Sequence, residues 1–528
     1  MLGLKRPFSS ACAMGVRRGI RSAAGPGSGP GLEPETAGYF RRALETLQEG
    51  LSPEELALFA PNVLAEAAAA GPGVALDPGG SRVLQALLPQ APLGVLGRIL
   101  PPLVLGGLGG PAGHPLGARV LEAALGRVLP ALGEAVGPAK EEEEEEAEAV
   151  GPVEEAVGRL AAAVRDDPVA FARHPAGSFV VRALLRVLGG APGAGVPQLP
   201  PGGAGPKTKG VELALKGVEP ASEGAELPPS FPPLLGQLAE AFEEHLASLL
   251  SPAGASLCLQ VALEVLHRSQ SPACSRLCNT LIGQLAPPSP APAESALVGG
   301  LQDPERSRLL EAAMAVAGPQ RLRELFRQQL KGRLRGVAAH RVANHGLQRL
   351  LDHAPADVVG EVLSELGPAL AEPLARGHPG VLTALLGACR RHPGLQQEAL
   401  RCLFQAFGCW EPRERQKACV GLLAGLRPFG GGDKAAEGAE PEGHFLSLAC
   451  HRNGSRVLDA IWVSASGPAR AAIADELASQ HEALQRDPHG RGVARTLALD
   501  LFQRRRRLWE RLQAAPDRRS LLGPLLED

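Results

Sequence analysis

Apolar side chains return at every third or fourth position along most of the chain. Between residues 180 and 188, valine or leucine stands at 180, 181, 184, 185 and 188, which is one face of a helix. The chain is 45% hydrophobic but only 3% aromatic, a composition that suits closely packed short helices better than twisted sheets. Because 65 Gly and 49 Pro would interrupt long helices, the pattern predicts many short helices joined by turns.

One nine-residue pattern recurs with few changes: Gly, then Ser or Ala, then apolar residues at helical spacing. The strong copies begin at Gly80, Gly117, Gly177 and Gly454. A polar residue stands three positions before each of them, and three of the four are followed by Pro; they are Asp77, His114, His174 and His451. We expect these residues to cap helices. Stacked repeats would hold the histidines far apart, so they are not expected to share a metal ion.

The spacing between copies indicates a regular repeat. Weaker copies begin at Pro252, Asp303, His340, Gly377 and Asp487. Three intervals between starts are 37 residues, one is 36, and one of 74 is twice the period, with a degenerate copy expected near 411–419. The other intervals, of 60, 78 and 51 residues, each contain low-complexity sequence. They indicate loops inserted into an array whose units must stack to bury their apolar faces.

This periodicity divides the chain into repeats and insertions. The predicted segments are a disordered basic tail (1–31), N-terminal repeats (32–138), an acidic loop insertion (139–152), one repeat (153–188), a Pro/Gly-rich loop insertion (189–233), central repeats (234–427), a Gly/Glu-rich bridge (428–443), C-terminal repeats (444–512) and a C-terminal tail (513–528). The first segment has five basic residues and no acidic one, which fits either a disordered tail or a mitochondrial transit peptide. We expect the tail.

The repeated helix, Gly-Ser-x-x-Val/Leu-Gln/Glu-x-Leu, resembles the Pumilio (PUF) repeat, and the resemblance extends over residues 36–528. It implies an all-α fold, a curved Pumilio-type helical repeat solenoid with low-complexity loop insertions. In that family one helix of each repeat faces RNA, and two or three side chains at fixed positions read one base. The chain departs from the family at 428–443, where a short bridge stands in place of further repeats.

Three positions of each repeated helix are candidate RNA contacts, because residues i, i+1 and i+4 lie close together on a helix. The first and third members carry mostly hydrogen-bonding groups, and the second is mostly Arg, Phe or His, whose planar group can stack on a base. The candidates are Ser81, Arg82, Gln85, Arg119, Glu122, Ser178, Phe179, Arg182, Ser307, Arg308, Glu311, Asn344, His345, Gln348, Ser455, Arg456, Asp459, Arg491 and Arg495. Taken one at a time, each is equally compatible with an ordinary solvated helix residue.

The resemblance relates the set at Asn344 to uracil and the pair Ser307 and Glu311 to guanine. The unit at Gly377 instead offers Val381, Leu382 and Leu385, which cannot read a base edge. We therefore expect a mixed array of reading and silent units.

Other chemistry finds little support in the sequence. The net charge is −2, so a nucleic-acid surface must be a local patch. The nine Cys form no Cys-x-x-Cys pair, and buried, reduced thiols are expected. There is no phosphate-binding loop, nucleophile elbow or zinc-binding helix, so no catalytic residue, cofactor or metal is predicted. The basic run 504–507 fits a phosphate contact, a nuclear localisation element or a solvated helix equally.

The resemblance implies an RNA-binding protein of small-subunit ribosome biogenesis. It would bind the precursor of the small-subunit ribosomal RNA and sterically control its cleavage, in the nucleolus, with proteins of the pre-ribosomal particle as partners. No membrane partner is expected, since no apolar run reaches the roughly 18 residues of a membrane span. No small-molecule substrate is expected either. The alternative is a HEAT/armadillo-like scaffold that binds proteins and no nucleic acid.

Overall fold

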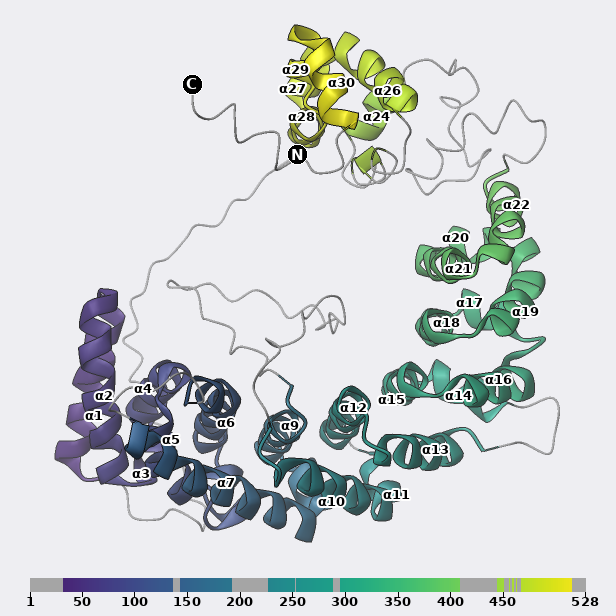
Figure 1. Cartoon of the computed structure of the whole chain (residues 1–528). Helices are drawn as coiled ribbons and strands as arrows, with labels where there is room; N and C mark the ends of the chain where they lie inside the picture. Colours follow the sequence, from purple (N-terminus) through teal and green to yellow (C-terminus); the bar gives the residue numbers. More distant parts are fainter. Residues whose placement is uncertain are drawn as a thin grey trace, which may run out of the picture. The chain divides into compact units, whose positions relative to one another are not determined.

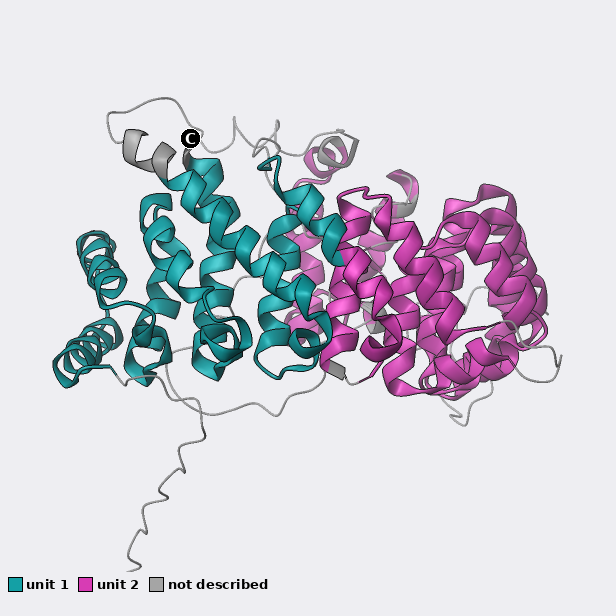
Figure 2. Cartoon of the chain, turned by 90° about the horizontal axis from the view of Figure 1, so that it is seen from below, with its two compact units in different colours: residues 1–238 teal, residues 239–528 magenta. Residues whose placement is uncertain are grey.

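The computed structural model describes residues 32–135, 143–191, 227–251, 253–287, 295–408, 444–450, 455, 458, 459, 462 and 467–514. Within these residues every regular element is a helix and there is no β-strand (Figure 1). The chain divides into two compact units, residues 1–238 and 239–528 (Figure 2). The expected all-α fold is therefore confirmed. No helix in the described ranges is both long and apolar enough to cross a membrane.

Unit 1 consists of two rows of helices. Its elements are α1 (Pro34–Glu49), α2 (Pro53–Ala70), α3 (Gly73–Leu76), α4 (Pro78–Leu87), α5 (Leu93–Leu103), α6 (Pro115–Ala135), α7 (Glu143–Asp166), α8 (Pro168–Arg173) and α9 (Gly177–Leu188), with 3-10 turns η1 (Leu88–Gln90), η2 (Gly107–Gly109) and η3 (Pro111–Gly113). Helices α4, α6 and α9 pack in succession, and α2, α5 and α7 form the second row. The division between the units falls within α10 (Phe231–Glu244).

Unit 2 also contains a row of helices that pack in succession. Its elements are α11 (Leu246–Leu249), α12 (Ala253–Arg268), α13 (Ala273–Leu285), α14 (Ala296–Gln302), α15 (Pro304–Val316), α16 (Pro319–Leu325), a π-helical turn η4 (Phe326–Leu330), α17 (Leu334–Ala339), α18 (Ala343–His353), α19 (Ala356–Leu366), η5 (Gly367–Ala369), α20 (Ala371–Ala375), α21 (Pro379–Arg391), η6 (Pro393–Leu395), α22 (Gln396–Ala406), α24 (His444–Ala449), α26 (Gly467–Ser479), α27 (His481–Arg486), α28 (Pro488–Thr496), α29 (Leu499–Arg504) and α30 (Arg506–Ala514). Helices α12, α15, α18 and α21 pack in succession. We call α4, α6, α9, α12, α15, α18, α21 and α28 the repeat helices.

A glycine in the first turn of a repeat helix lets the preceding short element pack closely against it. A Cβ atom on Gly80 would lie 2.5 Å from the carbonyl oxygen of Val74, and one on Gly117 would lie 2.5 Å from that of Pro111. Gly490 is similarly tight. Since real Cβ atoms do not come this close to a backbone oxygen, the recurring Gly is required by packing and does not break the helix.

Within the predicted acidic loop insertion 139–152, residues 143–152 belong to α7, which begins at Glu143, and residues 139–142 lie outside the described residues. Glutamate is a good helix former, and negative charge is favourable in the first turn of a helix. The Gly/Glu-rich bridge 428–443 and the tails 1–31 and 515–528 lie outside the described residues.

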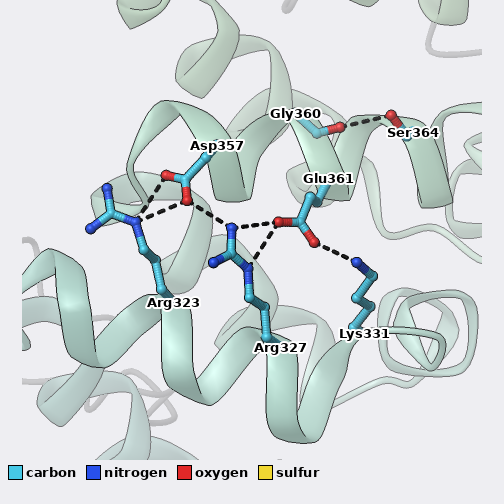
Figure 3. A network of polar contacts seen from close by, with 7 residues as sticks. All are labelled: Arg323, Arg327, Lys331, Asp357, Gly360, Glu361 and Ser364. Atoms are coloured by element: carbon cyan, nitrogen blue, oxygen red, sulfur yellow. Dashed lines mark hydrogen bonds and ion pairs between the residues drawn. The ribbon is translucent and has the colours of Figure 1, made fainter.

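Successive repeats of unit 2 are also joined on the side away from the repeat helices. Arg323 bonds to Asp357 at 2.9 Å, and Arg327 bonds to both Asp357 and Glu361, at 2.9 and 2.7 Å. Lys331 completes the row, 2.7 Å from Glu361 (Figure 3). These pairs are partly exposed, so each one stabilises the fold only slightly, but together they hold α19 against α16 and η4.

Candidate nucleic-acid interface

A polar side chain caps the repeat helices at the position expected from the sequence. Asp77 Oδ2 accepts hydrogen bonds from the backbone N–H groups of Gly79 and Gly80, both at 2.8 Å. Asp303 and Asp487 do the same at α15 and α28. The cap prediction is confirmed for these helices.

Histidine takes the same place in three other repeats. The Nδ1 atom of His174 accepts from the N–H groups of Ala176 and Gly177, at 3.2 and 3.1 Å. His114 and His340 accept in the same way before α6 and α18. A ring nitrogen can accept only when it carries no proton, so these histidines act as caps in their neutral form. His451 lies outside the described residues.

The first member of four candidate sets is a buried polar residue. Ser81 has no exposed surface, and Ser178, Ser307 and Asn344 are 5%, 2% and 2% exposed. The three serine hydroxyls donate to the carbonyl oxygen three residues earlier. Asn344 donates to the carbonyls of His340 and Arg341, at 2.8 and 2.9 Å. These buried residues thus lie beneath the surface that the other two members of each set form.

The second members are exposed. They are Arg82, Arg119, Phe179, Arg308 and His345, together with Gly492 in α28, where Arg491 and Arg495 are exposed on either side. A planar group thus projects from each of α4, α6, α9, α15 and α18. Helices α4, α6 and α9 are neighbours within unit 1, and α15 and α18 are neighbours within unit 2. Such a row can stack on nucleic-acid bases and contact phosphates.

The third members are half-buried and turn back toward the first. Gln348 Nε2 donates to Asn344 Oδ1 at 2.8 Å, and Gln85 Nε2 donates to the Ser81 carbonyl at 3.1 Å. Arg182 Nε donates to the Ser178 carbonyl at 3.1 Å. These bonds hold the side chains in place before any ligand arrives, which reduces the entropy lost on binding. Glu122 and Glu311 are also half-buried.

Phe179 is the largest exposed apolar group in this row, at 38% exposure. The Arg182 guanidinium lies 4.4 Å from the ring centroid, and that of Arg119, from the neighbouring α6, lies 5.8 Å away. The arginines orient the ring and add positive charge at its face. An aromatic ring among cations can stack with a base and attract the adjoining phosphates.

Glu311 is the acidic member of the α15 set. Burial raises the pKa of its carboxyl, while the charges of Arg349 and Arg308 act in the opposite direction. A carboxylate at this position can accept two N–H groups of one base edge, provided that it is ionised.

Two repeat helices received no base-contacting set from the sequence pattern. The α12 unit carries its set at Ser256, Leu257 and Gln260, where Gln260 Nε2 donates to Ser256 Oγ at 3.1 Å as in the other repeats. Its only signal was Gly-Ala-Ser in place of Gly-Ser. In α21 the exposed second position is Thr383, one residue beyond the expected one, because Val381 and Leu382 are both buried.

The C-terminal candidates are only partly described. Ser455 and Asp459 lie in short helical segments and are half-buried, whereas Arg456 lies outside the described residues. In the basic run 504–507, Arg506 binds Asp475 through two bonds of 3.1 Å and stacks on Phe502 at 4.8 Å. Arg506 is thus engaged in holding α30 in place.

The described cysteines do not form a metal site. No group of three His, Cys, Asp or Glu side chains converges within the ranges that the structure describes. Burial raises the pKa of the Cys278 thiol to about 12, and that of Cys274 is raised by burial too. Since metal ligation needs the thiolate, these two side chains act as core residues.

Comparison with known proteins points to one family. The chain matches the NOP9-like PUF repeat domain over residues 120–442 and 439–492, and a Pumilio-family RNA binding repeat over residues 73–92. This chain belongs to the NOP9-like PUF family. It is 36% identical over 598 aligned positions to Nucleolar protein 9 of Homo sapiens, covering 96% of this chain and 93% of that protein. Nucleolar protein 9 of Mus musculus is 35% identical over the same shares.

A solved structure shows the same fold. APUM23-GGAGUUGACGG superposes with a TM-score of 0.60 and 20% identity, covering 92% of this chain and all of that one. The Pumilio-type repeat fold is therefore confirmed. NOP9-like PUF proteins bind RNA and are not enzymes.

Proposed function

We propose that this protein binds RNA through the side chains at the starts of its repeat helices. The observation that supports this best is the repeated arrangement itself. The capped helices α4, α9 and α18 each present a buried Ser or Asn, an exposed planar group and an inward-turned third member, and α6 and α15 present the exposed planar group as well. A solvated helix face has no need to place a planar group at the same position of each repeat.

The RNA is proposed to be the precursor of the small-subunit ribosomal RNA. This chain aligns over almost its whole length with proteins named Nucleolar protein 9, which supports a place in the nucleolus and in ribosome biogenesis. APUM23, which shares the fold, was solved with GGAGUUGACGG. Because members of this family are not enzymes, the protein would act on processing sterically, by covering a cleavage site together with proteins of the pre-ribosomal particle.

Direct binding tests the proposal. A fragment of the small-subunit rRNA precursor and a scrambled strand of the same length are titrated with the full chain at two salt concentrations. We expect the precursor to bind more tightly and both affinities to fall with salt. Arg82→Ala with Arg308→Ala should weaken binding by about tenfold or more, whereas the charge-matched pair Arg276→Ala with Arg401→Ala, whose guanidinium groups pair with Glu240 and Glu398, should not.

Two results would contradict the proposal. Equal affinity for both RNAs would remove the precursor as the specific ligand. Absence of RNA binding at low salt, with a folded chain, would favour a protein-binding scaffold.

A further inference from the structure

An open groove of about 690 Å³ lies at the edge of unit 2, beside the row of candidate RNA contacts. It is formed by α17, by the short link between α17 and α18, and by α20 with the residue that follows it. Its polar lining consists of Arg335, His340, Arg341, Glu372 and Arg376. The described lining thus contains three arginines and one carboxylate.

One carboxylate, that of Glu372, faces the three arginines, and it interacts electrostatically with Arg335 and Arg376. Glu372 binds Arg335, with Nε–Oε2 at 2.7 Å. Arg376 donates to the Ala339 carbonyl at 3.4 Å, and Arg341 is exposed with no ion pair among the described residues. The groove therefore has an excess of positive charge, which suits an anionic group.

Arg341 is also a departure from the repeat. In α4, α6, α9, α15 and α28 the capping residue is followed by Pro, whereas His340 is followed by Arg341. The arginine thus stands at a position where those five repeats place proline, which carries no charge and no side-chain donor. This change gives the groove one of its three arginines.

The groove is continuous with the base-contacting row. Asn344, a candidate base contact, donates to the backbone carbonyls of His340 and Arg341, at 2.8 and 2.9 Å. A strand whose base lies against His345 would therefore pass beside the groove. An RNA strand supplies a phosphate at every nucleotide, and arginine binds phosphate with two parallel N–H groups.

We propose that this groove binds a backbone phosphate of RNA where the strand leaves the base-contacting row and crosses the edge of unit 2. The inference rests on the proposed RNA-binding function. It adds a site that directs the path of the flanking RNA and contributes affinity without base specificity.

The test compares a short and a long RNA. An RNA selected for tight binding to the wild-type chain is trimmed to its minimal form, and a second version carries uridine tracts at both ends. We expect Arg341→Ala with Arg376→Ala to leave the minimal RNA unchanged and to weaken the extended RNA about tenfold. The salt dependence of the extended RNA should become shallower, by about 0.7 for each phosphate that the variant no longer binds.

The matched control is Arg276→Ala with Arg401→Ala, which removes two arginines that pair with Glu240 and Glu398 elsewhere in unit 2. An equal loss in this control would mean that only net charge matters, and the groove would be rejected. Unchanged affinity of the extended RNA for the groove variant would also reject it. If the groove variant bound the extended RNA as the wild type does but lost binding to an acidic peptide, the groove would belong to a protein partner and the proposal would be rejected. If the selection yielded no RNA that binds the wild-type chain, the proposed function itself would be overturned, and this inference with it.

Discussion

At the residue scale, aspartate and histidine do the same work at the start of a repeat helix. Asp77 and His174 each accept two backbone N–H groups that the helix leaves without partners. The geometry needs one acceptor atom at a short distance from the backbone, and both Oδ and Nδ1 meet that need. The cap is therefore defined by its acceptor and not by its residue type.

Replacement of this cap has a predictable effect. His174→Ala should destabilise the first turn of α9 by about 1 kcal/mol, because two N–H groups lose their acceptor. His174→Asp should retain most of the stability, since Asp fills this position in three other repeats. Hydrogen exchange of the amides at 176–178 measures the change. Equal protection in wild type and His174→Ala would show that the bond contributes nothing.

The carboxyl of Glu311 links RNA binding to pH. Its pKa is raised by burial, so the proton is bound at higher pH than for an exposed glutamate. A protonated carboxyl loses an acceptor, and we expect affinity for an RNA with guanine at this repeat to fall as pH drops through the raised pKa. The free energy of unfolding should change in the opposite sense, because burial penalises the charged form of the carboxyl. This free energy should be highest below the ordinary pKa of glutamate and should decrease as pH rises through the raised pKa.

Glu311→Gln separates these effects. The amide cannot titrate, so both the affinity and the unfolding midpoint should lose this pH dependence. Titrations of the same RNA across the range, with wild type and variant side by side, provide the measurement. A wild-type profile that matches that of the variant would exclude Glu311 from base recognition.

At the element scale, Gln329 holds an insertion in place. It lies in the π-helical turn η4, is 5% exposed, and donates to the Ala286 carbonyl at 2.8 Å while accepting from the Leu297 N–H at 2.9 Å. Residues 286 and 297 flank the insertion whose interior, 288–294, is not described. One side chain thus fixes both ends of a loop within the repeat array.

Loss of this side chain should be costly. Gln329→Ala leaves a buried N–H and a buried carbonyl without partners, and we expect unit 2 to lose about 2 kcal/mol. The neighbouring Gln328 is exposed, so Gln328→Ala is the control and should have no effect. Denaturant unfolding followed by a probe in unit 2 distinguishes them. If the two variants were equally stable, the bonds of Gln329 would not fix the loop.

Local signals explain which elements could be predicted. The starts of α4, α9 and α15 follow from an acceptor, a proline or a glycine within a few residues, and all of these are visible in the sequence. The register of α21 depends instead on which side chains neighbouring helices bury, and Leu382 gives no sign of this. In the same way, Arg341 lines a groove only because α20 places Arg376 at the same groove. Tertiary packing decides both, so the sequence alone could not reveal them.

At the scale of the whole molecule, the repeats determine how binding energy is distributed. Each repeat helix contacts mainly its neighbours, so a change in one repeat disturbs distant ones little. Exposed planar groups occur in unit 1, at Phe179, and in unit 2, at His345. Affinity for a long RNA is then expected to be a sum of small contributions, with no single dominant contact.

This distribution can be tested with two single variants and their combination. Phe179→Ala and His345→Ala should each weaken binding of the rRNA precursor by about 1 kcal/mol, the value of a base stacked on an aromatic side chain. Because two further repeat helices, α12 and α15, separate α9 from α18 along the chain, the free-energy losses should add in the double variant. Titrations under identical salt conditions measure all three. A double variant no weaker than the worse single one would mean that the RNA uses one set or the other, and that the row does not act as a continuous array of readers.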